Sequence, residues 1–483
     1  MSELRFNDDR LKPIAHKVLA GERLSFDDGL TLYRSPDLLA IGWLANSVRE
    51  KRYGNTCFFN VNRHINPTNV CVAHCKLCAF GRDPNAPGAY TFALEEIYQR
   101  AEQGMREGAT EFHMVGGLHP DLPFEYFLDL MRGLKKRCPS VHLKAFTMVE
   151  VGYFSRIAKL SIRDTLLALK DAGVDSLPGG GAEIFHPRVR KIICDHKVSG
   201  QQWLNIARTA HEIGLRSNAT MLYGHVETEE ERVDHLLALR GLQDETHGFA
   251  AFIPLAFHPA NTGLAHLPPP TGYHDLKSIA ISRLLLDNFD HIKAYWVMLT
   301  PSIAQIALRF GADDLDGTVV EEKIYHDAGA KTAEFTPRAE LERLIRDAGR
   351  IPVERDTLYR PVDRSKMPPP TGYHDLKSIA ISRLLLDNFD HIKAYWVMLT
   401  PSIAQIALRF GADDIDGTVV EEKIYHDAGA KTAEYTPRVE LERLIREAGR
   451  VPVERDTLYR PVDRSKMPPP PGPRPDVTLS INV

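Results

Sequence analysis

Three of the six cysteines in this 483-residue chain lie within eight residues of one another. Cys71, Cys75 and Cys78 form a Cys-x3-Cys-x2-Cys pattern, and three thiolates on one short segment favour an iron–sulfur or a zinc site. Structural zinc sites and ferredoxin-type clusters normally have four protein ligands, so three cysteines would leave one iron of a four-iron, four-sulfur (4Fe-4S) cluster open. The alternative is a zinc site completed by His74 or by a distant side chain. The other cysteines are isolated, and we expect them in the core: Cys57, Cys138 and Cys194.

Glycines beside polar residues follow several of the predicted strands. Gly116 and Gly117 stand just before His119, three glycines precede Glu183, and His258 follows an apolar run. Glycine allows a ligand to approach the backbone closely, and a few polar groups give a mostly apolar pocket its directed contacts. These residues are therefore candidates for a ligand site. The competing interpretation is a turn acid for Glu183 and an ordinary loop hydrogen bond for each histidine.

Apolar strands alternate with amphipathic helices from residue 57 onward, which favours a parallel α/β sheet. Residues 10–50 are expected to be helical and to precede the sheet. Eight strands, most of them followed by a helix, make a TIM-like (β/α) barrel the leading fold, and a doubly wound open sheet is the alternative. In a barrel the chemistry lies at the carboxyl ends of the strands. The predicted strands are residues 57–65, 111–115, 141–146, 174–177, 217–223, 249–255, 292–299 and 317–324, with helices at 94–107, 123–136, 161–172, 200–213 and 229–242.

A long repeat dominates the C-terminal half. Residues 268–367, here the first copy, recur as residues 368–467, the second copy, with five substitutions. The unique sequence of 383 residues fits one large barrel, and each copy reads as its closing α/β segment. Only one copy can occupy that position, and the shorter connection favours the first. The expected organisation is a helical extension at 1–50, a barrel at 51–367 including the first copy, the second copy at 368–467, and a disordered proline-rich tail at 468–483.

Composition excludes several classes of protein. Apolar residues make up 43% and charged residues 26%, which is not the composition of a disordered, collagenous or fibrous chain. A formal charge of −4 gives no basic footprint for nucleic acid. There is no apolar run of the roughly 20 residues that a membrane helix needs, and the charged N-terminus lacks a signal core. We expect a cytoplasmic protein that acts on a small molecule, with neither nucleic acid nor membrane as partner.

The cysteine pattern after the first strand of a βα barrel resembles the radical S-adenosylmethionine (radical SAM) superfamily. In that superfamily a reducing donor of flavodoxin or ferredoxin type supplies an electron to the cluster, and SAM on the open iron releases a 5′-deoxyadenosyl radical. The resemblance implies Cys71, Cys75 and Cys78 as cluster ligands, and Gly116 and Gly117 as contacts to the amino group of SAM. Two positions depart from the usual pattern: Leu77, where an aromatic residue is common, and Leu118, where an acidic residue often follows the glycines.

Further segments narrow the resemblance to the menaquinone and deazaflavin branch of the superfamily: 66–71, 115–121, 176–184, 219–228 and 242–246. Within it, residues 142–150, 217–223 and 253–258 are more similar to aminofutalosine synthases than to cyclic dehypoxanthinyl futalosine synthases. This implies addition of the 5′-deoxyadenosyl radical to 3-[(1-carboxyvinyl)oxy]benzoate, giving 6-amino-6-deoxyfutalosine and CO₂ in menaquinone biosynthesis. The cyclase activity and a non-catalytic metal-binding scaffold stay open as alternatives.

The implied reaction assigns roles to the polar candidates. Glu183, His119 and His258 are the catalytic candidates because of their positions, and Glu183 is also expected to contact SAM or substrate. The substrate carries two carboxylates, so cations or hydrogen-bond donors should converge on the barrel mouth. Asn218 and Thr220 have the alternation that places both on the interior face of one strand. The residues considered for the carboxylates are Arg82, Lys144, Arg216, His225 and His258.

Overall fold

Three helices open the chain in the computed structural model, which describes residues 6–362, 373–419, 432–433 and 435–462. They are α1 (Leu11–Ala20), α2 (Phe26–Arg34) and α3 (Leu38–Tyr53), as expected for residues 10–50. The Ser25 hydroxyl accepts a hydrogen bond from the backbone N–H of Asp28, and the Asp28 carboxylate accepts one from Ser25 in return, so α2 begins with a complete capping box. Helix α3 then packs along a helix of the first copy, α11 (Gly272–Leu285).

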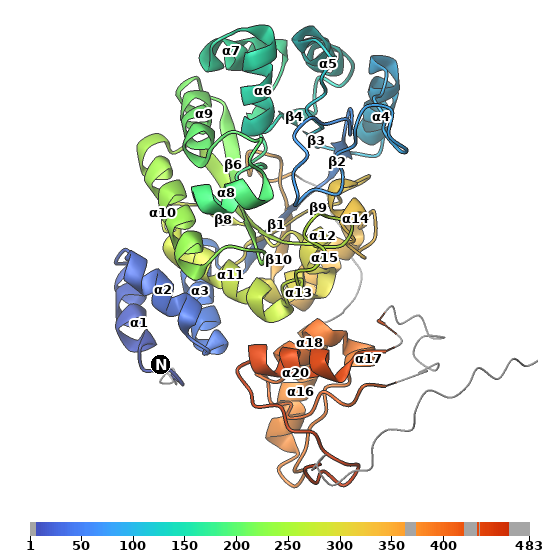
Figure 1. Ribbon diagram of the computed structural model, residues 1–483. Coiled ribbons are helices and arrows are strands. Elements are labelled where there is room, and N and C mark those ends of the chain that lie inside the picture. The colour runs from blue at the N-terminus through green and yellow to red at the C-terminus, as the bar shows by residue number, and fades with distance from the viewer. Residues whose placement is uncertain (1–5, 363–372, 420–431, 434, 463–483) are drawn as a thin grey trace, which may run out of the picture.

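A curled parallel sheet forms the centre of the molecule (Figure 1) and confirms the α/β fold expected from the alternating pattern. Within the described residues its seven strands lie in the order β2-β3-β4-β5-β6-β7-β8, so each strand pairs with its neighbours in the chain. Helices cover its outer face (Figure 1), as right-handed crossovers require. The strands are β2 (Asn62–Ile65), β3 (Glu111–Met114), β4 (His142–Ala145), β5 (Ser176–Leu177), β6 (Arg216–Tyr223), β7 (Phe249–Ala256) and β8 (His291–Ile292).

A smaller parallel sheet brings the two ends of the large one together. Its order is β10-β1-β9, with β1 (Thr56–Asn60), β9 (Asp314–Gly317) and β10 (Ile351–Glu354). An isolated bridge between Lys293 and Asp314 links it to the β8 side, and a bridge between Arg63 and Val320 links the following segment to β2. The predicted strand 57–65 is therefore two strands, and β1 and β2 belong to different sheets.

The first copy differs from the expected strands in three places. The strand predicted at 292–299 ends at Ile292, and Trp296–Leu299 forms the short helix α12. The strand predicted at 317–324 is wrong, because β9 ends at Gly317 and Ile324–Asp327 is the helix α14. Strand β10 was not expected. Short apolar runs such as Trp296–Leu299 have no periodicity that separates helix from strand.

Helices between the strands complete the barrel wall. The C-terminal part of the first copy adds α13 (Pro301–Ala307) and α15 (Arg338–Asp347). The helices that follow the strands are α4 (Leu94–Arg106), α5 (Phe124–Arg137), α6 (Met148–Ala158), α7 (Ile162–Ala172), α8 (Pro187–Ile193), α9 (Gly200–Glu212) and α10 (Glu229–Thr246).

The second copy lies below the barrel, in orange and red (Figure 1). It contains α16 (Tyr373–Leu385), α17 (Trp396–Leu399), α18 (Pro401–Ala407) and α20 (Arg438–Glu447). Its α18 contacts α11 and α13 of the first copy. The expected tail at 468–483 and the junction at 363–372 lie outside the described residues.

No helix in the described ranges is both long and apolar enough to cross a membrane.

Candidate functional site

A cavity of about 270 Å³ opens at the carboxyl ends of the strands, where a barrel is expected to carry its chemistry. Residues from six of the strands or the loops after them line it, together with residues of the first copy. Of the predicted site residues, the cavity lining contains Cys71, Cys75, Cys78, Gly116, Gly117, Glu183 and His258.

The three clustered cysteines share this cavity. They are partly exposed, whereas Cys57, Cys138 and Cys194 are buried as expected. Backbone N–H groups point at two of the sulfurs: Ala73 donates to Cys71 Sγ at 3.5 Å and Gly81 to Cys78 Sγ at 3.4 Å. Burial raises the pKa of the Cys75 thiol to about 12, so a metal would have to displace its proton.

Among the described residues, no three His, Cys, Asp or Glu side chains are gathered closely enough to hold a single metal ion. A four-iron cluster needs its thiolates spread around a wider core. Three accessible thiols around one cavity, two of them receiving N–H groups, fit that kind of donor set.

The glycine pair after β3 lies against the cysteine segment. A Cβ on Gly117 would come within 2.1 Å of the carbonyl oxygen of Val70, so glycine is required here for contact between two backbone segments. The N–H of Gly117 donates to the carbonyl oxygen of Thr68 at 2.8 Å. This position was predicted from the sequence as a ligand contact, but the packing of the two loops already requires glycine.

Glu150 occupies the position next to this pair. Its carboxylate accepts hydrogen bonds from the N–H of Gly116 at 3.0 Å and from the N–H and hydroxyl of Thr147 at 2.7 and 2.8 Å. Burial raises the pKa of Glu150 to about 7, although these hydrogen bonds favour the ionised form. An acidic group therefore lies beside the glycines, although Leu118 replaces the usual one in sequence. Glu150 lies in the segment 142–150 that carries the family resemblance, but the sequence pattern did not assign it to the site.

Glu183 forms an ion pair with Lys197 inside the cavity. Lys197 Nζ lies 2.6 Å from Glu183 Oε1, and both residues line the wall. Burial would raise the pKa of Glu183, but Lys197 holds it below its ordinary value. Burial would lower the pKa of Lys197, but Glu183 and Cys75 raise it well above normal. Lys197 could not be identified from the sequence, because a contact between a strand loop and the α8–α9 loop leaves no local pattern.

Two further expectations concern the inner wall. Asn218 and Thr220 both line the cavity, which confirms that these alternate residues of β6 face inward. His258 Nε2 lies 3.1 Å from the carbonyl oxygen of Met298 and acts as the donor in the neutral ring. Burial lowers the pKa of His258, so the ring is neutral at pH 7 and its Nδ1 is an acceptor.

His119 lies outside the cavity lining. Its Nδ1 accepts hydrogen bonds from the backbone N–H groups of Asp121 and Leu122 at 3.1 and 3.2 Å. The ring thus stabilises the turn before α5, and the structure does not bring it to the other candidates.

Most of the cations considered for substrate carboxylates are also elsewhere. Lys144 is buried against Glu111 at 2.7 Å, and His225 is buried against Glu227 at 2.9 Å. Of the five considered, His258 alone is in the cavity lining; the others are Arg82, Lys144, Arg216 and His225.

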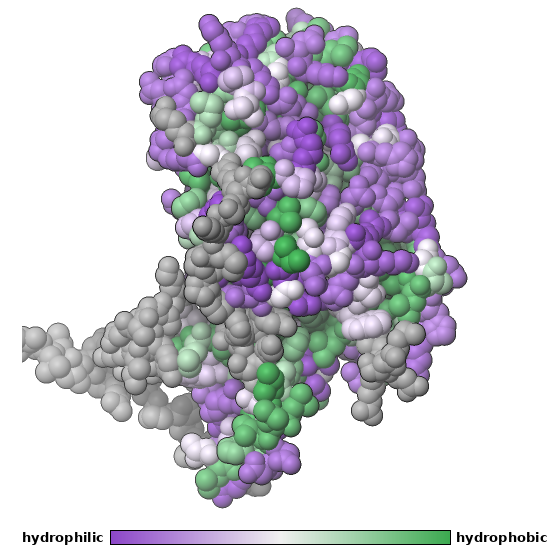
Figure 2. Space-filling model, turned by 180° about the vertical axis from the view of Figure 1, so that it is seen from behind, coloured by the Kyte–Doolittle hydropathy of each residue, from purple (hydrophilic) through white to green (hydrophobic). Residues whose placement is uncertain are grey.

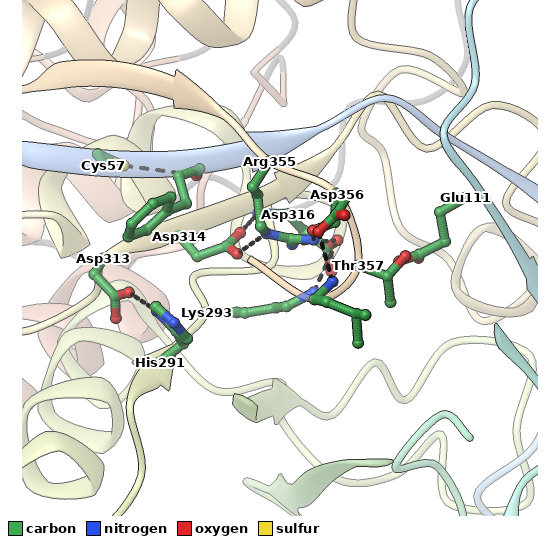
Figure 3. Close-up of polar contacts among 12 residues, drawn as sticks. Cys57, Glu111, His291, Lys293, Asp313, Asp314, Asp316, Arg355, Asp356 and Thr357 are labelled. Carbon is green, nitrogen blue, oxygen red and sulfur yellow. Dashed lines mark hydrogen bonds and ion pairs between the residues drawn. The ribbon is translucent and has the colours of Figure 1, made fainter. Parts of the chain in front are cut away.

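A buried polar network joins the first copy to the rest of the barrel (Figure 3). Arg355 Nε lies 2.7 Å from Asp314 Oδ2, Lys293 lies 3.2 Å from Asp316, and His291 lies 2.6 Å from Asp313. The Thr357 hydroxyl donates to Glu111 of β3 at 2.7 Å. Because Asp316 also lines the cavity, this network fixes one of its walls.

The cavity lining also contains residues that were not assigned to the site from the sequence. His64 and His113 are opposite each other on β2 and β3, with stacked rings 4.6 Å apart. Burial lowers the pKa of both rings. Tyr295, Glu322 and Tyr325 come from the first copy, and the Tyr295 hydroxyl is buried without a hydrogen-bond partner among the described residues.

Two family models match the chain. The radical SAM superfamily matches residues 65–239, and the CofH/MqnC C-terminal region matches twice, at residues 246–368 and 364–467. The match at residues 364–467 corresponds to the second copy of the repeat.

Several characterised relatives are similar over most of their length. Aminodeoxyfutalosine synthase of Thermus thermophilus is 51% identical over 359 residues, which cover 74% of this chain and 96% of the relative. A 5-amino-6-(D-ribitylamino)uracil–L-tyrosine 4-hydroxyphenyl transferase of Methanopyrus kandleri is 42% identical over 323 residues, 66% of this chain and 88% of the relative. Cyclic dehypoxanthine futalosine synthase of Streptomyces coelicolor is 38% identical over 353 residues, 72% and 88% of the two chains.

Among solved structures, methylornithine synthase superposes with a TM-score of 0.57 at 18% identity, covering 70% of this chain and 97% of that one. At this identity the likeness supports the fold alone.

Proposed function

The chain belongs to the radical SAM superfamily of enzymes, and we propose that it is an aminofutalosine synthase of menaquinone biosynthesis. The observation that carries the proposal is the 51% identity to aminodeoxyfutalosine synthase across 96% of that relative. Identity to the transferase and to the cyclase is lower, at 42% and 38%. The proposed substrate is 3-[(1-carboxyvinyl)oxy]benzoate, and the proposed products are 6-amino-6-deoxyfutalosine and CO₂.

Cys71, Cys75 and Cys78 would hold the 4Fe-4S cluster. When bound, this group supplies the electron that splits SAM into methionine and the 5′-deoxyadenosyl radical. The partly exposed thiols and the N–H groups of Ala73 and Gly81 support this assignment. A small flavodoxin or ferredoxin is the proposed electron donor.

The acidic groups of the cavity would orient SAM. Glu150 lies beside Gly116 and Gly117, so its carboxylate would accept hydrogen bonds from the methionyl ammonium of SAM. The positive charge of that ammonium would favour the ionised form of Glu150. Glu183 is held ionised by Lys197 and would accept hydrogen bonds from SAM or substrate. His258 would present Nδ1 as an acceptor, since its Nε2 is engaged by Met298.

The apolar wall would exclude water from the radical and hold the substrate near it. Leu222, Ile253, Leu255 and Phe257 line this side of the cavity. Such a wall favours addition to a double bond over quenching by solvent. His64, His113, Asn218 and the Tyr295 hydroxyl are neutral polar groups of the cavity that would bind the substrate carboxylates.

The test is a product assay with anaerobically reconstituted protein, SAM, a reductant and the enol-ether benzoate. We expect an adenosyl adduct of the mass of 6-amino-6-deoxyfutalosine, and none with Cys78→Ala. Free 5′-deoxyadenosine formed only with dehypoxanthine futalosine would instead identify a cyclase. Stoichiometric zinc without iron would contradict both enzyme assignments.

A further inference from the structure

The second copy exposes an apolar surface that the first copy buries. In the first copy, Leu284, Leu285 and Phe289 are 5%, 0% and 0% exposed, and in the second copy Leu384, Leu385 and Phe389 are 80%, 74% and 55% exposed. Figure 2 shows hydrophobic residues gathered on the lower part of the molecule, where the second copy lies. A contiguous exposed apolar surface of this kind marks an interaction site. We call this surface, formed by Ile381, Leu384, Leu385, Leu386 and Phe389, the second docking face.

The first copy shows what covers an identical surface. The Leu285 side chain lies against Gly29 of α2 beside Val233 of α10, and the Phe310 ring lies over Gly42 of α3. Arg350 donates to Glu50 of α3 at 2.6 Å. The partner of this face is therefore the outer surface of α2, α3 and α10 in residues 6–267.

All of the docking residues named for the first copy recur in the second. Leu385, Phe410, Arg450 and Thr457 replace Leu285, Phe310, Arg350 and Thr357 without a change of residue type. The five substitutions are conservative: Leu315/Ile415, Phe335/Tyr435, Ala339/Val439, Asp347/Glu447 and Ile351/Val451. None of them is in the cavity lining.

The second copy would also supply the same wall of the active site. The first copy contributes Tyr295, Asp316, Glu322, Ile324, Tyr325 and Ala328 to the cavity. One hundred positions later the sequence has the same residue types; of these, Tyr395 and Asp416 are described by the structure, and positions 420–431 lie outside the described residues. The chain therefore carries two sequences that can complete one cavity.

The second copy is already organised internally for docking. Two ion pairs of Figure 3 are repeated in it: Arg455 lies 2.5 Å from Asp414, and Lys393 lies 3.1 Å from Asp416. Trp396 also donates to the carbonyl oxygen of Gly417 at 2.8 Å, as Trp296 does to Gly317. His391 stacks on Tyr459 at 3.8 Å, as His291 does on Tyr359 at 3.4 Å. The two copies differ in burial: the side chains of Arg283 and Asp313 are fully buried, whereas those of Arg383 and Asp413 are about one third exposed.

We propose that the second copy is an alternative closing segment, whose docking face binds the α2, α3 and α10 surface of its own chain when the first copy is displaced. The two closed forms share their contacts with residues 6–267. They differ mainly in the loop that must be closed, and the longer loop of the second copy makes the first copy the favoured occupant. The second copy thus becomes the main occupant only when docking of the first is weakened.

The test weakens one copy at a time in the full-length chain. Leu285→Asp introduces a carboxylate at the docked face, and Leu385→Asp is its matched control in the second copy. We expect Leu385→Asp to leave soluble yield and iron content unchanged. Leu285→Asp should keep more than half of both, because the second copy takes over. In the double variant, soluble yield and iron content should both fall at least tenfold.

Hydrogen exchange followed by mass spectrometry gives a second readout. The substitution makes the two otherwise identical peptides distinguishable by mass. In Leu285→Asp, the peptide containing Leu385 should be as protected as the peptide containing Leu285 is in Leu385→Asp, and the peptide carrying the substitution should be unprotected in both variants. The milder pair Phe310→Ala and Phe410→Ala should show the same transfer of protection if the charged substitution prevents folding.

Two results would overturn the proposal. One is a Leu285→Asp protein that fails as completely as the double variant, together with no transfer of protection in Phe310→Ala. The other is rescue seen only in a dimer, with sedimentation that depends on concentration, because the second copy would then close a neighbouring chain.

Discussion

The ion pair between Glu183 and Lys197 is a close contact between two buried charges in the cavity wall. Removing one partner of such a pair leaves a buried charge without compensation, whereas removing both does not. We predict that Lys197→Met lowers the free energy of unfolding by about 3 kcal/mol. The effect of Glu183→Gln should be smaller, because the amide oxygen still accepts a hydrogen bond from Lys197.

A double-mutant cycle in urea, with all variants reconstituted under the same conditions, measures this coupling. The double variant should be more stable than the sum of the single effects predicts by at least about 1 kcal/mol. Strict additivity would mean that the two charges do not stabilise each other.

Asp275 gives the protein a pH dependence that is independent of the cluster. It is buried in α11 and accepts a hydrogen bond from the Tyr223 hydroxyl at 2.7 Å, and burial raises its pKa from 3.8 to about 7. The folded state therefore binds this proton more tightly than the unfolded state does. The contribution of Asp275 to the free energy of unfolding is greatest below pH 4. It falls by up to about 4 kcal/mol as the pH rises towards 7 and is constant above pH 7.

We predict that Asp275→Asn flattens this part of the stability profile. Melting temperatures at pH 5 and pH 8 should differ less in the variant than in the parent protein. Tyr223→Phe is the control: it keeps the carboxyl and removes its hydrogen bond, so the slope should persist. Equal slopes in the parent and Asp275→Asn would contradict the assignment.

At the scale of elements, the close contact between the loop after β3 and the cysteine segment predicts that a side chain at Gly117 disturbs the cluster ligands. Gly117→Ala places a methyl group against the backbone of Val70, so one loop must move and the cysteines with it. We expect a loss of iron loading of at least fivefold, measured as iron per chain after reconstitution. Gly241→Ala is the matched control, because its Cβ would meet nothing within 4 Å inside α10 and should add about 0.5–1 kcal/mol of stability. Normal iron content in Gly117→Ala would contradict the prediction.

The same elements show which features sequence patterns could predict. The parallel sheet, the N-terminal helices and the inward face of Asn218 and Thr220 follow from periodicity, which local sequence contains. The helix Trp296–Leu299 and strand β10 depend on tertiary contacts, such as the bond from Trp296 Nε1 to Gly317 at 2.8 Å. The position of Lys197 in the site also depends on a tertiary contact: it lies 14 residues from Glu183 in sequence and contacts it only once α8 is folded. The candidate residues predicted from sequence were those beside glycines or in a spaced motif.

For the whole molecule, the contacts between the copies set the expected cost of removing the second one. The first copy supplies β8, β9, β10 and α11 to the barrel. The second copy contributes α18 on α11 and α13, α16 on α13, and two hydrogen bonds: one of 3.4 Å from the Tyr273 N–H to Gln405 and one of 2.8 Å from Arg409 to the carbonyl oxygen of Pro36. Contacts of this size are worth about 2 kcal/mol at most.

We therefore predict that a chain ending at residue 367 folds and loads iron like the full chain, with a free energy of unfolding lower by no more than about 2 kcal/mol. A chain ending at residue 267 should be insoluble, because β1 would lose both neighbours in the small sheet and α3 would lose α11. Urea titrations and iron content of the shortened and full chains measure the difference. Failure of the 367-residue chain to load iron would make the second copy an essential part of the barrel, since the first copy alone would then be too weak a closure.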